Sequence, residues 1–298
     1  MFLFIRRNAV SLLAYTNIRL LTQSIQIQSH LQISKPVDPI FVEFAEILSP
    51  YENVEDRLLS IAMRIPKLQS LANNLLSRPS CNIDDSTVLQ LVRAAGDLDR
   101  ELAEWARQIP IKSSYTTVTR MKHSRDQHLS DSNFTPNHLH RYPNFYAARV
   151  WNSYRVYRLI IQSILFRASS FLGGQDQSHI ENINRIMVGD ICASVPFLLG
   201  YDFSELRSSN DTLPDESFLW PQSSVNKVTS SERTGKFSLI WPLYVACSVL
   251  SVPDTQRRWM RAQLRWIAET GEAQALLVQD SESRTLIGGP ESFRFDCV

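Results

Sequence analysis

Apolar residues recur at helical spacing along most of this chain, and the clearest stretch lies between Asp84 and Pro110. The apolar positions form two rows that each repeat every seven residues: Val88, Ala95, Leu102 and Ile109, and Leu91, Leu98 and Trp105. Because the residues between these rows are mostly charged or polar, one face packs and the others meet solvent. Asp84 is a good N-cap and Pro110 a good stop. The pattern predicts a helix packed within its own domain, in preference to a coiled coil.

Five further segments have the same helical spacing of apolar residues. They cover residues 54–76, 143–173, 179–195, 237–250 and a stretch that begins near residue 253. Pro66 should kink or split the first of these helices, and Pro143 suits the first turn of the second. No segment shows sustained alternation of apolar and polar residues, and the chain has only 9 glycines, so a turn-rich β fold is unfavourable. We predict an all-α fold.

Two polar stretches interrupt the helices, at about residues 112–141 and 202–236. The second is rich in serine and has too few apolar residues to order itself. Helices of the same character flank both stretches, so we interpret them as long loops within one domain. The expected architecture is a single large irregular helical bundle over residues 1–277, followed by a C-terminal tail at residues 278–298.

Two segments resemble membrane or targeting sequences. Residues 237–253 carry no charge, but they are shorter than a bilayer span and contain Pro242, which favours a buried helix. Residues 1–35 contain Arg6, Arg7 and Arg19 and no acidic residue, as in a mitochondrial transit peptide. The strongly apolar character of this start favours a core helix, and the mitochondrial alternative stays open.

Motifs for catalysis are absent from the sequence. Gly235-Lys236 lacks the upstream glycine of a phosphate-binding loop, and neither a Gly-x-Ser-x-Gly elbow nor a His-Glu-x-x-His zinc motif occurs. The paired carboxylates Asp84-Asp85 and Asp97-Asp99 lie at a helix start or on a polar helix face. Capping and solvation explain them better than acid–base chemistry does. We predict that the chain is not an enzyme and has no catalytic residue.

The sequence gives little evidence of a metal or cofactor site. Four cysteines, Cys81, Cys192, Cys247 and Cys297, are scattered without the close pairs that bind structural zinc or form a disulfide framework. Four of the 6 histidines fall in the first polar stretch: His123, His128, His138 and His140. Two histidines without a carboxylate in register give at best a weak metal site. We predict buried or incidental thiols, no functional metal and no cofactor, and leave cofactor-binding residues unassigned.

A basic and aromatic helix is the most prominent cluster. Its cations are Arg141, Arg149, Arg155, Arg158 and Arg167, and its rings are Tyr142, Phe145, Tyr146, Trp151, Tyr154, Tyr157 and Phe166. Cations interleaved with rings can bind single-stranded nucleic acid or phosphates. However, Tyr154 and Tyr157 lie on the apolar stripe and the arginines fall on several faces. We interpret it as a packing helix whose arginines pair with carboxylates elsewhere.

Four parts of the chain, in order, carry a resemblance to a known family. The similar segments lie at residues 98–105, 146–161, 190–197 and 240–267. They read Leu98-Asp99-Arg100-Glu101-Leu102-Ala103-Glu104-Trp105, Tyr146-Ala147-Ala148-Arg149-Val150-Trp151-Asn152-Ser153-Tyr154-Arg155 with Arg158-Leu159-Ile160-Ile161, Asp190-Ile191-Cys192-Ala193-Ser194-Val195-Pro196-Phe197, and Ile240-Trp241-Pro242-Leu243-Tyr244-Val245-Ala246 with Arg257-Arg258-Trp259 and Gln263-Leu264-Arg265-Trp266-Ile267. In this order they resemble the fungal-specific regulatory domain that follows the binuclear zinc cluster in fungal transcription factors. The resemblance covers roughly residues 10–277 and implies an all-α regulatory domain, a nuclear location and control of RNA polymerase II transcription.

The family's DNA-binding head does not match anything in this sequence. That head is a cluster of six closely spaced cysteines, commonly followed by a basic linker and a coiled coil, so zinc ligands and direct DNA binding do not carry over. We expect either a headless relative, acting as a decoy or dimerisation partner of full-length regulators, or a truncated gene model. The expected partners are proteins, including a second copy, or a small effector, with no DNA or membrane contact. The alternatives to the nucleus are the cytoplasm and the mitochondrion, with a helical mitochondrial or metabolic protein as the remaining alternative.

Overall fold

The computed structural model describes residues 27–31, 34–42, 54–76, 84–120, 134–174, 177–200, 230–272 and 275. The helices are α3 (Val54–Ala62), α4 (Ile65–Leu76), α5 (Asp85–Gln108), the short 3-10 helix η3 (Ile111–Ser113), α6 (Phe145–Phe171), α7 (Ser178–Leu198), α8 (Ser230–Cys247) and α9 (Asp254–Glu269). The strands β1 (Thr116–Arg120) and β2 (His138–Arg141) form one small antiparallel sheet. The predicted all-α class is therefore confirmed.

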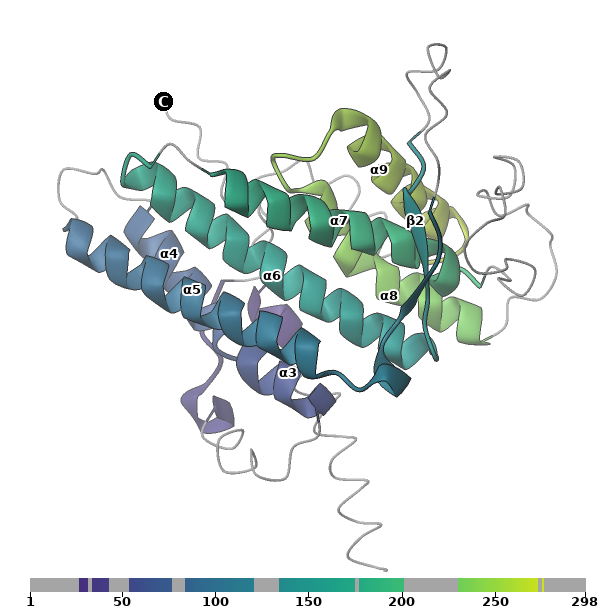
Figure 1. The fold of residues 1–298 in the computed structure, drawn as a ribbon, viewed down its shortest axis with the longest axis horizontal. Helices are drawn as coiled ribbons and strands as arrows, with labels where there is room; N and C mark the ends of the chain where they lie inside the picture. The colour runs from purple at the N-terminus through teal and green to yellow at the C-terminus, as the bar shows by residue number, and fades with distance from the viewer. Residues whose placement is uncertain are drawn as a thin grey trace, which may run out of the picture.

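Helix α6 lies at the centre of the bundle, between α5 on one side and α7 on the other (Figure 1). It also packs against α4 and α8. Its buried residues therefore lie on several faces, as a central helix requires. The side chain of Asn144 caps its first turn by accepting a hydrogen bond from the amide of Ala147 at 2.8 Å. Pro143 thus precedes the cap and does not occupy the first turn as predicted.

Helix α5 confirms the seven-residue pattern. Six of the seven predicted seam residues are buried along it, from Val88 to Trp105, while Ile109 is its C-cap. Asp84 is the N-cap, with Oδ1 accepting from the amide of Ser86. At the far end of the seam Trp105 packs on two rings of α6, with centroid distances of 5.5 Å to Trp151 and 5.3 Å to Tyr154. The seam is therefore an intramolecular contact.

The predicted interruption at Pro66 is also confirmed, because α3 ends at Ala62 and α4 begins at Ile65. Tyr154 and Tyr157 belong to the core, as predicted. Cys192 and Cys247 are buried free thiols, and Cys81 and Cys297 lie outside the described residues. Among the described helices, none is long and apolar enough to span a bilayer. Of residues 1–35, where a core helix was expected, residues 27–31 are helical, and residues 1–26 lie outside the described part, as does the tail at 278–298.

The first polar stretch is not wholly a loop. Its two ends pair as β1 and β2, with Thr116 opposite Arg141 and Arg120 opposite His138, and the register shifts between Thr117 and Thr119. The strands are too short to produce a recognisable alternation in the sequence. Their burial of Val118 and Leu139 joins this small sheet to the protein interior.

The second polar stretch also ends earlier than predicted, because α8 begins at Ser230 instead of Phe237. Lys236, expected in a solvated loop, is buried, and its ammonium lies 4.6 Å from the ring centroid of Trp266 on α9. Burying the aliphatic stem against a ring compensates for the loss of solvent around the charge. Residues 201–229, the remainder of this stretch, lie outside the described residues.

Candidate functional site

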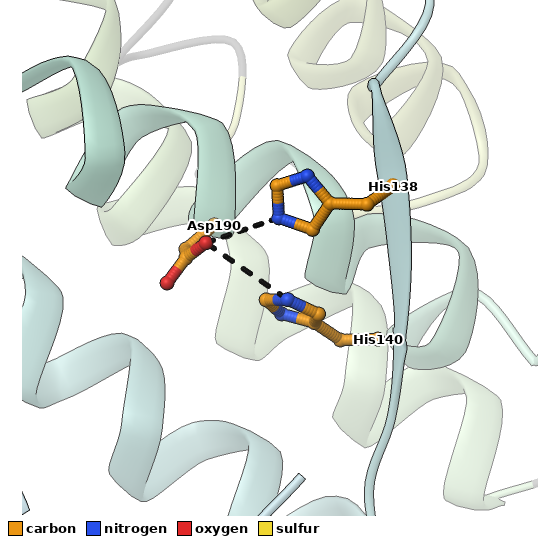
Figure 2. A group of neighbouring side chains, drawn as sticks. All are labelled: His138, His140 and Asp190. Atoms are coloured by element: carbon orange, nitrogen blue, oxygen red, sulfur yellow. Dashed lines mark hydrogen bonds and ion pairs between the residues drawn. The ribbon is translucent and has the colours of Figure 1, made fainter. Parts of the chain in front are cut away.

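A polar cluster lies where β2 packs on α7 and meets the side chain of Arg155 from α6. We define it as Tyr115, His138, His140, Tyr142, Arg155 and Asp190. His138 and His140 project from the same side of β2 toward Asp190 on α7 (Figure 2). Because side chains alternate along a strand, the spacing of two residues places both rings on one face. The cluster thus joins the sheet to the two central helices.

Asp190 is the anion at the centre of this cluster. Its Oδ1 lies 3.1 Å from Nε2 of His138 and 3.9 Å from Nε2 of His140. Its Oδ2 accepts a hydrogen bond from the hydroxyl of Tyr115 at 3.3 Å and lies 3.7 Å from Nε of Arg155. Each carboxylate oxygen therefore faces a different element, the strand on one side and α6 on the other.

Arg155 is the cation of the cluster and has no exposed surface. Its Nη1 donates to the hydroxyl of Tyr142 at 2.7 Å and to Oδ1 of Asn152 at 2.8 Å, and Nη2 lies 3.3 Å from Nδ1 of His140. Its guanidinium carbon lies 5.0 Å from the ring centroid of Tyr115. A buried guanidinium requires such partners, because desolvation opposes its charge.

The protonation states follow from this arrangement. Burial, and then the nearby charge of Arg155, lowers the pKa of His140 to about 2, so its ring is neutral at physiological pH. Burial raises the pKa of Tyr142 to about 12, so it keeps its proton. Although burial acts in the opposite direction, the hydrogen bond from His138 and the charge of Arg155 hold the pKa of Asp190 below its usual value. The cluster therefore contains a buried ion pair, Arg155 with Asp190.

The tautomer of His140 is fixed by its neighbours. Its Nδ1 faces two donors, the guanidinium of Arg155 and the hydroxyl of Tyr142, each at 3.3 Å. Because arginine can only donate, Nδ1 must accept, and the ring proton sits on Nε2, on the side of Asp190. This assignment leaves His140 hydrogen-bonded on one nitrogen and directed toward a carboxylate on the other.

The same residues have the composition of a two-histidine, one-carboxylate metal site. One ligand atom from each of His138, His140 and Asp190 lies within 4.8 Å of the others. Coordination through Nε2 of His140 would move its proton to Nδ1, where it would meet the guanidinium of Arg155. A divalent cation would also add its charge beside that buried arginine. The arrangement therefore favours the internal ion pair over a metal.

The sequence interpretation is confirmed for two arginines of the basic helix. Arg155 pairs with Asp190, and Arg158 pairs with Asp99 on α5. Arg149 instead lies over the ring of Tyr146 at 5.5 Å, and Arg167 donates to Asn73 on α4 at 2.8 Å. The arginines of α6 therefore serve to pack the helix against several neighbours.

The participation of Asp190 was not predicted. The sequence offered no carboxylate beside His138 and His140, and Asp190 reaches them from a different helix only in the folded chain. His123 and His128 lie outside the described residues. The sequence signals for the site were the spacing of His138 and His140, which puts both on one face once they lie in a strand, and the presence of Tyr142 and Arg155 in the basic and aromatic cluster.

The chain is similar in sequence to "Transcription factor dbaG" from Emericella nidulans, with 27% identity over 221 residues. The similar region covers 74% of this chain and 50% of that relative, so the chain spans about half the length of the relative that it matches. No protein-family model matches the chain. No solved structure matches it significantly. The similarity supports a relationship to fungal transcription factors.

Proposed function

We propose that this chain is a helical regulatory domain of fungal transcription-factor type, which controls RNA polymerase II transcription through contacts with proteins or a small effector. The observation that carries the proposal is the similarity to Transcription factor dbaG over 74% of the chain. The all-α bundle supports it, because it agrees with the fold implied by the resemblance of residues 98–105, 146–161, 190–197 and 240–267. A nuclear location follows from this role.

The polar cluster supports a structural and not a catalytic use of its residues. A general acid or base must reach a substrate, whereas His140 and Arg155 are buried and hydrogen-bonded to each other and to Tyr142. Asp190 already faces both histidines and Arg155. We assign the cluster the role of holding the β1–β2 sheet against α6 and α7. The surface that the sheet forms on the domain then has a fixed position.

The proposed domain does not itself bind specific DNA sequences. The four cysteines of the sequence are far apart, so they do not supply the closely spaced thiolates of a binuclear zinc cluster. The charged residues nearly cancel at net +1, which gives no strong field toward phosphates. The purified chain should therefore show no sequence-specific, salt-resistant DNA binding in a mobility-shift assay.

A tethering assay tests the regulatory role. The chain is fused to a heterologous DNA-binding domain in a fungal host that carries a reporter with the matching sites. We expect the fusion to raise or lower reporter transcription relative to the DNA-binding domain alone. The control is a Trp105→Ala fusion, in which loss of a ring at the α5–α6 contact should unfold the domain and abolish the effect. A folded, nuclear fusion that leaves the reporter unchanged would contradict the proposal.

A further inference from the structure

A surface pocket of about 160 Å³ lies where the end of α5 and η3 meet the first turns of α6. Its wall includes Ile109, Lys112 and Ser113 on one side and Tyr146, Ala147 and Val150 on the other. The indole N–H of Trp151 donates to the carbonyl oxygen of Ser113 at 3.0 Å, which holds η3 against α6. The polar cluster contributes no residue to this wall. The pocket is therefore a separate, preformed feature of the junction between α5 and α6.

Apolar side chains line this pocket and continue onto the surface beside it. Ala147 is buried, and Ile109 and Val150 are half-buried. Tyr146 is 45% exposed, and Ile111 of η3 is 94% exposed. Because a cavity of about 150 Å³ holds benzene in a protein core, the pocket has room for one aromatic or leucine-sized side chain. The exposed apolar residues flank a cavity and are not scattered singly, which is the arrangement of a contact site.

The cations at this pocket have no acidic partners. The two segments that build the pocket contain Lys112 and Arg149 and no acidic residue. Neither side chain forms an ion pair within the described part of the chain, and Arg149 lies over the ring of Tyr146. A third cation, Arg57 of α3, donates to Gln108 at the end of α5 at 3.0 Å. Positive charge therefore surrounds the apolar surface.

The exposed arginines elsewhere on α5 are paired. Arg100 lies next to Asp97, and Arg107 lies next to Glu104, the acid of α5 nearest to the pocket in the sequence. The cations around the pocket thus differ from their neighbours in having no counter-charge. An acidic partner would supply that charge, whereas a basic partner would be repelled. Charge complementarity therefore favours an acidic partner.

We propose that this surface binds an acidic segment of another protein, which inserts one large apolar side chain into the pocket. The inserted side chain, a phenylalanine or a leucine, packs on Ile109 and Val150, and a second apolar residue of the segment covers Ile111. Carboxylates on either side of the inserted residue face Lys112 and Arg149. The apolar contacts supply most of the affinity, and the charges supply selectivity and fast association.

Binding is measured on the purified full chain by methyl NMR titration with the synthetic peptide acetyl-Asp-Glu-Asp-Phe-Asp-Asp-Leu-Asp-amide. We expect the peptide to shift the methyl signals of Ile109, Ile111 and Val150. Two control peptides should each bind at least about tenfold more weakly: one has Asn and Gln in place of the acids, and the other has Ser in place of Phe and Leu. Equal binding of either control, shifts confined to other methyl groups, or no binding at about 1 mM peptide would overturn the proposal.

Surface variants locate the contact. Ile111→Ser replaces a side chain that the fold leaves exposed, so the variant should fold normally and bind the acidic peptide about fivefold more weakly. Lys112→Glu should also weaken the acidic peptide, and should bind a peptide with Lys in place of the acids more tightly than the wild type does. Lys67→Glu, at an exposed lysine of α4, is the matched control and should bind the acidic peptide like the wild type. Unchanged affinity in Ile111→Ser or in Lys112→Glu would contradict the proposed contact.

Other occupants of this surface would give different results. If a second copy of the chain covers it, sedimentation would show a concentration-dependent dimer that Ile111→Ser abolishes. If a nucleic acid binds it, a single-stranded oligonucleotide would shift the same methyl signals at lower concentration than the acidic peptide. Either result would replace the acidic segment as the partner and overturn the proposal.

The role of this contact in transcription rests on the proposed function, whereas the binding of the acidic peptide does not. In the tethering assay we expect the Ile111→Ser fusion to change reporter transcription less than the wild-type fusion does. If the peptide binds but the wild-type fusion leaves the reporter unchanged, the proposed function fails and the contact stands. If the peptide does not bind and both fusions change the reporter equally, the contact fails and the proposed function stands.

Discussion

Arg158 on α6 donates two parallel hydrogen bonds to Asp99 on α5, with Nε 2.8 Å from Oδ1 and Nη2 2.7 Å from Oδ2. The side chains are only 12% and 14% exposed, so solvent screens the pair little. Nη1 of Arg158 also donates to the hydroxyl of Tyr154 at 3.3 Å, beside the Trp105 contact. The pair therefore fixes the rotation of α5 about its apolar seam relative to α6.

Breaking this pair should destabilise the fold. We expect Asp99→Asn to lower the free energy of unfolding by about 2 kcal/mol, because it leaves the guanidinium of Arg158 partly buried without its counter-charge. Asp97→Asn, which removes an exposed partner of Arg100 on the same helix, should change it by less than about 0.5 kcal/mol. Urea denaturation of both variants checks the difference. Equal effects would show that the α5–α6 pair contributes no more than a surface pair.

The polar cluster predicts a pH dependence of stability. His140 has a pKa of about 2 in the folded chain, far below its ordinary value of 6.5, so the unfolded chain binds a proton that the folded chain does not. Stability is therefore complete above about pH 6.5 and falls as the pH drops, by about 2 kcal/mol at pH 5. In His140→Gln this loss should largely disappear between pH 6.5 and pH 5.

Urea denaturation at pH 7 and pH 5 measures the His140 effect. Gly96→Ala on α5, away from the cluster, is the control variant and should keep the wild-type difference between the two pH values. If His140→Gln loses as much stability as the wild type on going to pH 5, then the proton is not taken up by His140 and the assigned neutral ring is wrong.

A glycine determines how closely α8 approaches α7. A Cβ at Gly235 would lie 2.0 Å from the carbonyl oxygen of Leu198 and 3.0 Å from a ring carbon of Phe145, so the backbones must separate to admit it. Gly235→Ala should lower the free energy of unfolding by about 1–3 kcal/mol. Gly96→Ala, where a Cβ meets nothing within 4 Å, should raise it by about 0.5–1 kcal/mol because alanine favours the helix. Thermal or urea unfolding measures both changes. Changes of opposite sign in the free energy of unfolding would support the close approach of α8 to α7, and changes of the same sign would contradict it.

Metal addition tests the assignment of the polar cluster as an ion pair. Because Nδ1 of His140 accepts from Arg155, we expect Co²⁺ at stoichiometric concentration to give no tetrahedral absorption bands with the purified chain. Intense bands that disappear in Asp190→Asn, but persist in the exposed-histidine variant His179→Gln, would show that His138, His140 and Asp190 bind metal after all.

Local features of the fold could be predicted from the sequence because their causes are local. The seam of α5 follows from apolar spacing, its start from the capping side chain of Asp84, and the break between α3 and α4 from Pro66. The buried positions of Tyr154 and Tyr157 follow from the stripe of α6. In each case the residues that decide the structure lie within a few turns of one another.

Features that depend on distant contacts were not predictable. Strands of five and four residues are too short to alternate visibly, and the sheet exists because β1 and β2 pair across the intervening stretch. The first turns of α8 form where Gly235 lies against α7, and Lys236 is buried because Trp266 of α9 covers it. The meeting of His140 with Asp190 similarly requires the whole bundle.

Transcriptional control is the central claim, and transcript levels measure it most directly. The gene is deleted in its native organism, and RNA is sequenced from the deletion strain and from strains complemented with the wild type or with Trp105→Ala. We predict that a defined set of transcripts changes on deletion, returns with the wild type and fails to return with the unfolded variant. An unchanged transcript profile, under conditions in which the protein is present in the wild-type strain, would contradict the account.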